Sequence, residues 1–115
     1  MLLFKKRFLD AIRAGGKTQT IRLWPYRRMR AGQRSYIPGA GYIEVLSVEP
    51  VDIAELTDDD AAPDGFDSAE SLRAELAHLY SNASGEDQQA YRVRFRLLTE
   101  PEQLVARSER KTRRR

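Results

Sequence analysis

A helix that stops at two glycines and runs directly into a β-branched segment is the feature that most restricts the fold of this sequence. Apolar residues recur at helical spacing in the segment 4–14, with charged residues between them, which predicts an amphipathic helix over 6–14. Gly15 and Gly16 follow, and glycine ends helices readily because it adopts the left-handed conformation at no steric cost. Residues 18–24 are rich in β-branched side chains and predict a strand. The chain therefore starts with a helix–turn–strand unit.

The turn and the strand of this unit carry the densest chemistry in the sequence. Alternate residues of a strand share a face, so Thr20 and Arg22 lie together while Gln19 and Ile21 point to the other side. Lys17 precedes the strand and is free to lean over either face. We therefore treat this stretch as a candidate site as well as a turn.

The rest of the chain predicts a mixed fold. Further strands are expected at 33–38, at 42–51 with a bulge and at 90–98, where apolar residues alternate with arginines. We expect a capped helical turn at 57–60, a loop at 61–66, a helix at 68–80 capped by Asp67 and a polar loop at 81–88. Short strands with attached helices predict an α+β fold, a small, partly closed β-barrel with two or three helices.

The chain is long enough for one hydrophobic core and too short for two. We expect one domain over 1–104 and a basic, disordered tail over 105–115. The absence of cysteine excludes a disulfide framework and thiolate chemistry, and the single histidine, His78, argues against a histidine-based metal site. We therefore expect no metal and no cofactor. No apolar run reaches the roughly 18 residues that span a membrane, which predicts a cytoplasmic protein with no membrane partner.

Charge is strongly segregated along the chain. Residues 1–50 carry ten Lys and Arg against three Asp and Glu, whereas residues 51–90 carry one against eleven. A polyanion should therefore meet the N-terminal half and the tail, and not the middle. The acidic segment 52–70 is a candidate surface for a protein partner.

With these residues in view, the chain resembles the ASCH domain family, which belongs to the PUA-like superfold of small β-barrels. The family motif Gly-x-Lys-x-x-Glu-x-Arg corresponds here to Gly15, Lys17, Thr20 and Arg22, with Thr20 where many members have glutamate. This variant is similar to the motif of the bacterial acetylcytidine amidohydrolases. The resemblance covers about residues 3–98 and implies an RNA- or nucleoside-binding domain.

The amidohydrolase resemblance implies a catalytic group of lysine, threonine and glutamate. Lys17 and Thr20 match it directly, and Asp64 occupies the place of the glutamate in the loop before the second long helix. Thr20 would attack the amide. Lys17, with a pKa well below its usual value, would take the proton of Thr20, and Asp64 would protonate the leaving amine. The structural alternative is a strand threonine, a solvated lysine and a loop carboxylate.

Two classes of function, binding and hydrolysis, thus remain open. The leading hypothesis is recognition of RNA or a modified nucleoside in a cleft formed by residues 15–22, the basic loop after Trp24 and the Asp64 loop. The alternatives are hydrolysis of an N-acylated cytidine-type nucleoside, or metal-independent RNA cleavage, by Lys17, Thr20 and Asp64. Arginine forks can hold phosphates and aromatic rings can stack on bases. An internal ion pair would explain Arg22 equally well, and exposure or core packing is the usual fate of residues such as Trp24 and Tyr26. The expected nucleic-acid contacts are Arg22, Trp24, Tyr26, Arg27, Arg28 and Arg30.

Overall fold

The computed structural model describes residues 2–80 and 88–113. Those residues form, in chain order, α1 (Lys6–Ala14), β1 (Gln19–Trp24), β2 (Arg34–Ile37), β3 (Gly41–Val51), the 3-10 turn η1 (Ile53–Glu55), α2 (Asp58–Ala61), the 3-10 turn η2 (Ala62–Asp64), α3 (Ala69–Leu79), β4 (Gln89–Leu97) and α4 (Glu100–Arg113). Most of the loop predicted at 81–88 lies outside the described residues.

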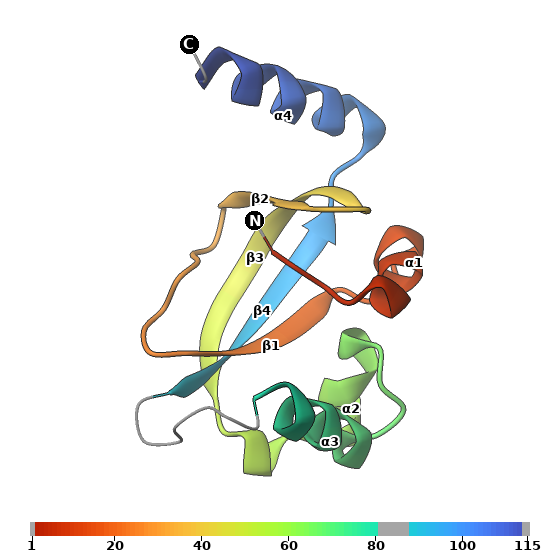
Figure 1. The fold of residues 1–115 in the computed structure, drawn as a ribbon, viewed down its shortest axis with the longest axis vertical. Coiled ribbons are helices and arrows are strands. Elements are labelled where there is room, and N and C mark those ends of the chain that lie inside the picture. The colour runs from red at the N-terminus through yellow and green to blue at the C-terminus, as the bar shows by residue number, and fades with distance from the viewer. Residues whose placement is uncertain (1, 81–87, 114–115) are drawn as a thin grey trace.

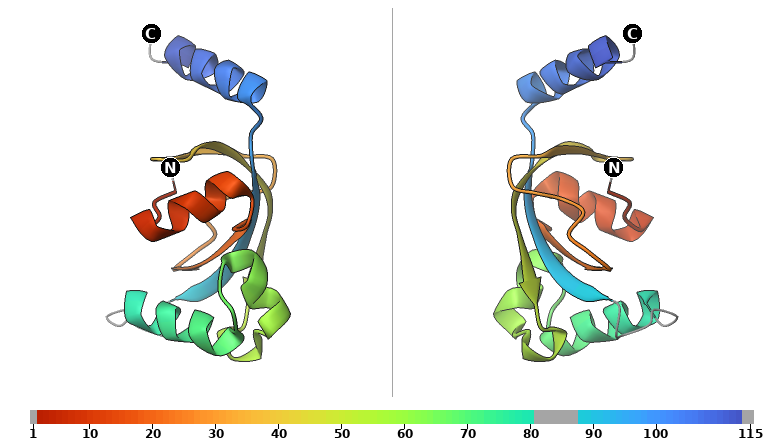
Figure 2. Two further views of the ribbon diagram at one scale, coloured as in Figure 1. Left: turned by 90° about the vertical axis from the view of Figure 1, so that its right-hand side faces the viewer. Right: turned by 90° about the vertical axis from the view of Figure 1, so that its left-hand side faces the viewer.

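The four strands form one antiparallel sheet in the order β1-β4-β3-β2. The sheet curls (Figure 1), and α1 lies on its inner side (Figure 2). β4 is an inner strand, and its Val93 stands opposite Thr20 of β1 and Val48 of β3. The register of β3 shifts between Val45 and Ser47, where the sequence predicts a bulge. The mixed α+β fold with a partly closed barrel is confirmed.

Within the described ranges, three clusters of buried apolar residues pack against the sheet, and two of them hold the helices that form the candidate site. The larger cluster packs α1 against the inner strands, with Ile12, Val45 and Phe95 almost fully buried. The second cluster joins β1 to α2 and α3 through residues such as Ile21 and Leu72. Helix α1 and helix α3 therefore pack against the sheet through separate clusters. The candidate site lies where α1, β1 and α3 meet.

Helix α3 begins one residue later than the sequence suggests. Its N-cap is Ser68, which forms a reciprocal capping box with Ser71, so the predicted cap Asp67 lies outside the helix. The loop expected at 61–66 contains the short turn η2, which ends at Gly65 in the left-handed conformation (φ 89°). This tight turn fixes the direction of the Asp64 side chain.

The segment expected to be a disordered tail is helical through Arg113, and α4 runs across the domain boundary predicted at residue 104. Thr99 starts this fourth helix, because its backbone N–H donates to Glu102 (2.9 Å) and its hydroxyl accepts from the backbone N–H of Glu102 (3.4 Å). Pro101 fits in the first turn, where its missing N–H is not needed. No helix in the described part of the chain is long and apolar enough to cross a bilayer.

Candidate functional site

The turn between α1 and β1 holds Lys17 by its backbone. Gly15 ends α1 in the left-handed conformation (φ 82°). The N–H groups of Gly16 and Lys17 then both donate to the carbonyl of Ala11, at 2.8 and 3.1 Å. The next residue, Thr18, donates to the carbonyl of Pro63 (2.8 Å), which ties the turn to η2. The two segments that carry Lys17 and Asp64 are therefore fixed to each other.

Lys17 and Asp64 form a buried ion pair. The ammonium nitrogen of Lys17 lies 2.6 Å from Oδ1 of Asp64 and also donates to the Asp64 main-chain carbonyl. The two side chains are 3% and 4% exposed, so water contributes little to their solvation. The structure thus brings together the lysine and the carboxylate that the resemblance paired.

Aromatic rings complete the surroundings of this ammonium. Its nitrogen lies 4.8 Å from the ring centroid of Phe8 and 5.7 Å from those of Phe4 and Phe66. All three rings are within the roughly 6 Å at which a cation is attracted to an aromatic face. Burial lowers the pKa of Lys17, and the neighbouring Asp64 carboxylate opposes that shift. Burial and the ion pair with Asp64 therefore act on the pKa of Lys17 in opposite directions.

Thr20 and Arg22 share a face of β1, as the strand alternation predicts. Nε of Arg22 donates to the Thr20 hydroxyl (3.0 Å), and Nη2 donates to the carbonyl of Leu3 (2.7 Å). The guanidinium also lies over the ring of Phe4, 4.7 Å from its centroid. Two of the five N–H donors of Arg22 thus have partners among the described residues, which leaves three for a ligand.

One pocket, of about 230 Å³, unites these side chains. Lys17, Thr20 and Arg22 line it from the turn and β1, whereas Asp64 lies behind Lys17 and is absent from the wall. The remaining wall comes from the N-terminal segment, α1, Phe66 and α3. These other lining residues are Leu3, Phe4, Lys5, Phe8, Ile21, Phe66, Leu72, Glu75, Leu76, Leu79 and Tyr80.

Two residues of this region were not found from the sequence. Glu75 of α3 lines the pocket and pairs with Lys5 (3.0 Å) and with Arg7. Those contacts, led by the hydrogen bond from Lys5, lower the pKa of Glu75. Gln19 is 1% exposed, and its amide donates to Oδ2 of Asp64 (3.2 Å). Gln19 and Thr20 lie on opposite faces of β1, so Gln19 contacts the Asp64 carboxylate from the face turned away from Thr20.

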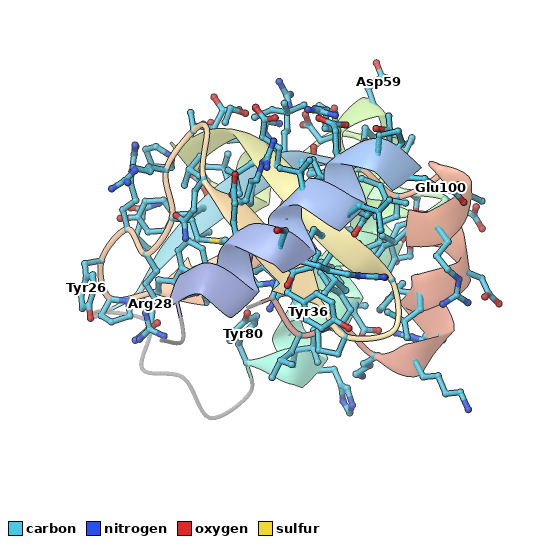
Figure 3. All side chains as sticks on the ribbon, turned by 90° about the horizontal axis from the view of Figure 1, so that it is seen from above. Tyr26, Arg28, Tyr36, Asp59, Tyr80 and Glu100 are labelled. Atoms are coloured by element: carbon cyan, nitrogen blue, oxygen red, sulfur yellow. The ribbon has the colours of Figure 1, made fainter. Side chains whose placement is uncertain are left out.

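The basic loop after Trp24 does not contribute to this pocket. Trp24 is 8% exposed and packs on Tyr91 in the core, with ring centroids 5.6 Å apart, which corrects its predicted stacking role. Tyr26 is 65% exposed and lies beside Arg28, whose guanidinium is 5.6 Å from the ring centroid (Figure 3). Arg27, Arg28 and Arg30 are also exposed. Of the predicted nucleic-acid contacts, Arg22 alone lines the pocket.

Part of the acidic segment 52–70 is used inside the fold. Asp64 neutralises Lys17, Asp60 pairs with Arg92 (2.8 Å), and Asp58 accepts from the backbone N–H of Ala69 (2.7 Å). In the described ranges, no group of three or more His, Cys, Asp or Glu side chains is arranged to hold a metal ion.

Comparison with known proteins supports the fold. No protein-family model matches the sequence, and no curated protein matches it significantly. Solved structures do match. The hypothetical protein PH0355 superposes with a TM-score of 0.71 at 14% identity, over 84% of this chain and 95% of that one.

Two further structures are similar at 19% identity and a TM-score of 0.61. Protein EF3133 from Enterococcus faecalis V583, described by the family model DUF984, matches 80% of this chain and 70% of its own. The ASCH domain from Lactobacillus crispatus JV V101 matches 77% of this chain and 69% of its own. At these identities the likeness concerns the fold, so the resemblance read from the sequence is confirmed at that level: this chain has the fold of an ASCH domain.

Proposed function

We propose that the pocket formed by α1, β1 and α3 binds a single nucleoside or one unpaired base of an RNA. The observation that carries the proposal is the convergence of Lys17, Thr20 and Arg22 on one small, largely apolar cavity. Such sites orient a ligand with a few polar groups while apolar walls exclude water. We also propose the cytoplasmic location that the sequence predicts.

The size and chemistry of the pocket favour one base-sized ligand. Its volume of about 230 Å³ falls below the roughly 300–1,000 Å³ that is usual for drug-sized ligands. Phe4 and Phe66 offer aromatic surface to a flat ring, and the unused N–H groups of Arg22 offer donors to a carbonyl oxygen. The Thr20 hydroxyl can donate while it accepts from Arg22. A pyrimidine with ring carbonyls would satisfy these groups.

Calorimetric titration with cytidine, N-acetylcytidine, uridine and adenosine tests this proposal. Thr20→Val keeps the size of the side chain and removes its hydroxyl, so we expect affinity to fall about tenfold, as for one lost hydrogen bond of about 1.4 kcal/mol. Arg94→Ala is the control, because Arg94 is exposed on β4 and does not line the pocket. The proposal fails if no nucleoside binds, or if the two variants bind equally well.

A second candidate, amide hydrolysis, is favoured by the buried pair of Lys17 and Asp64. Burial lowers the pKa of Lys17, which increases its neutral, proton-accepting fraction. Neutral Lys17 would take the proton of Thr20 as its oxygen attacks the acyl carbon, and Arg22 would stabilise the resulting oxyanion. The C–N bond then breaks as Lys17 returns the proton to the leaving nitrogen, and water hydrolyses the acyl-threonine. Asp64 would act through Lys17 by positioning it, and not as the proton donor expected from the sequence.

Incubation with N-acetylcytidine tests this step directly. We expect cytidine and acetate in equal amounts, detected by chromatography, with Thr20→Val inactive and Arg94→Ala unaffected. Product formed equally by Thr20→Val would refute attack by threonine. Mononucleotides released from RNA under the same conditions would point instead to the ribonuclease alternative.

A further inference from the structure

A second, larger hollow lies between the loop before β2, β2 itself and helix α4. Its volume is about 970 Å³, and it shares no lining residue with the nucleoside pocket. Arg28, Arg30 and Arg34 line it from the loop and β2, and Tyr36 lines it beneath α4 (Figure 3). Glu109 of α4 is the one acidic residue of its described wall. We call this hollow the arginine groove.

The cations of the arginine groove are largely uncommitted. Arg28 and Arg30 are exposed, and neither has an ion pair with any described residue. Arg34 reaches Glu109 only at 4.0 Å, where a partly exposed pair contributes little. Three positive charges facing one negative charge make the groove a site for a polyanion.

Polar contacts attach the first turn of helix α4 to strand β3 and to Arg96 of β4. The amide of Gln103 donates to the carbonyl of Tyr42 (2.9 Å) and accepts from its backbone N–H (2.8 Å). Arg96 bridges Glu102 of α4 and Glu44 of β3, at 2.8 and 2.7 Å. The wall that α4 supplies is therefore preformed, and a ligand need not order it.

An exposed aromatic ring next to these cations indicates which polyanion fits. Tyr26 is 65% exposed, and its ring lies beside Arg28. Basic grooves bordered by exposed aromatic rings bind single strands, since the phosphates contact the cations while a base stacks on the ring. The acidic residue Asp59 lies on the opposite side of the molecule (Figure 3), so it does not oppose binding here.

We propose that the arginine groove binds the sugar–phosphate backbone of a single-stranded nucleic acid. The groove and the nucleoside pocket are neighbours, because the N–H of Leu2 donates to the carbonyl of Tyr36 (3.0 Å) and Leu3 lines the pocket. Binding of a strand to the groove does not depend on whether the pocket takes a nucleoside.

Fluorescence anisotropy with labelled 12-nucleotide single-stranded RNA and DNA tests the groove. Each phosphate contact adds about 0.7 to the salt slope of a single strand, so removing two contacts should lower the slope by about 1.4 and the affinity about 25-fold at 0.1 M salt. Arg28→Ala/Arg30→Ala should show both losses. Lys6→Ala/Arg94→Ala removes the same charge from exposed positions outside the groove and should stay within about twofold of the wild type.

A variant with the opposite effect guards against loss of folding as the explanation. Glu109→Gln removes the one described acidic residue of the groove wall and should tighten binding of the same strand. Titration of the groove variants with nucleoside separates the two sites, since their pocket residues are intact. The proposal is overturned if both double variants lose affinity equally, if Glu109→Gln has no effect, or if phosphatidylserine vesicles bind and neither strand does. Preference for RNA or DNA identifies the source of the backbone.

Discussion

The ion pair of Lys17 and Asp64 gives the sharpest test of the site, because removing its charge has a calculable cost. Asp64→Asn retains the shape of the side chain, but it has one acceptor oxygen where Asp64 offers one to Lys17 and one to Gln19, and it leaves Lys17 without a counter-ion. Both partners are nearly inaccessible to water, so solvent cannot replace the lost carboxylate. The variant should therefore be destabilised well beyond an ordinary surface change.

The loss of stability depends on whether Lys17 stays charged or loses its proton in the folded variant. If Lys17 remains charged, breaking a buried pair costs about 3–5 kcal/mol. If Lys17 gives up its proton on folding, the cost is about 1.36 kcal/mol for each pH unit below its usual pKa, or about 4.6 kcal/mol at pH 7 and about 1.9 kcal/mol at pH 9. Only the cost of deprotonating Lys17 depends on pH, and at high pH it is the smaller of the two costs. The unfolded state then binds the extra proton, so stability relative to the wild type rises with pH.

Denaturant unfolding at pH 7 and pH 9 measures both quantities. We expect Asp64→Asn to lose about 3–5 kcal/mol at pH 7 and to recover roughly half of that at pH 9. Asp59→Asn, an exposed change in the same acidic segment, should stay within about 0.5 kcal/mol of the wild type. Lys17→Met in the Asp64→Asn background should restore part of the loss, since no unpaired charge remains. A loss below about 1 kcal/mol at pH 7 would refute the buried pair.

Three further predictions follow from burial and pKa. Trp24→Ala should cost about 3–5 kcal/mol of stability because it opens a core cavity. Tyr26→Ala should leave stability unchanged and weaken strand binding about tenfold. Unfolding measurements test the first effect and anisotropy measurements the second. Glu75 has a lowered pKa, so its stabilising contribution is present above about pH 4.3 and is lost as the pH falls through its folded pKa. The stability of Glu75→Gln should lack that acid dependence. Arg96 lowers the pKa of Glu102 to about 2, so the protection factors of the α4 amides, which correct for the slower intrinsic exchange in acid, should fall as the pH drops from about 4.3 toward that value, and Arg96→Met should abolish the change.

Local rules predicted most of the fold. Helix α1, its glycine stop and the face shared by Thr20 and Arg22 all follow from spacing along the chain, and the structure has them as expected. The helical tail was missed because its charges outweighed a local signal, the capping box of Thr99 and Glu102. That signal, with Pro101 in the first turn, was present in the sequence.

The composition of the pocket could be predicted only in part. Lys17 and Arg22 lie near each other in the sequence, and the resemblance added Asp64 across 47 residues. No sequence rule states which face of α3 covers β1, so Glu75 was missed. For the same reason the basic loop was expected at this pocket, whereas its Arg28 and Arg30 line the other hollow. Tertiary packing decided both.

The protonation state of Lys17 is what separates the two functions proposed for the pocket. A charged lysine can only donate, and it would hold a carbonyl of the bound base while Asp64 keeps it in place. A neutral lysine can accept the proton of Thr20, and burial favours that form whereas the 2.6 Å contact with Asp64 opposes it. Rising pH should therefore weaken simple binding and accelerate hydrolysis through one and the same titration. Measuring nucleoside affinity and cytidine release over the same pH series, with the Thr20→Val variant as reference, would show which of the two roles Lys17 has.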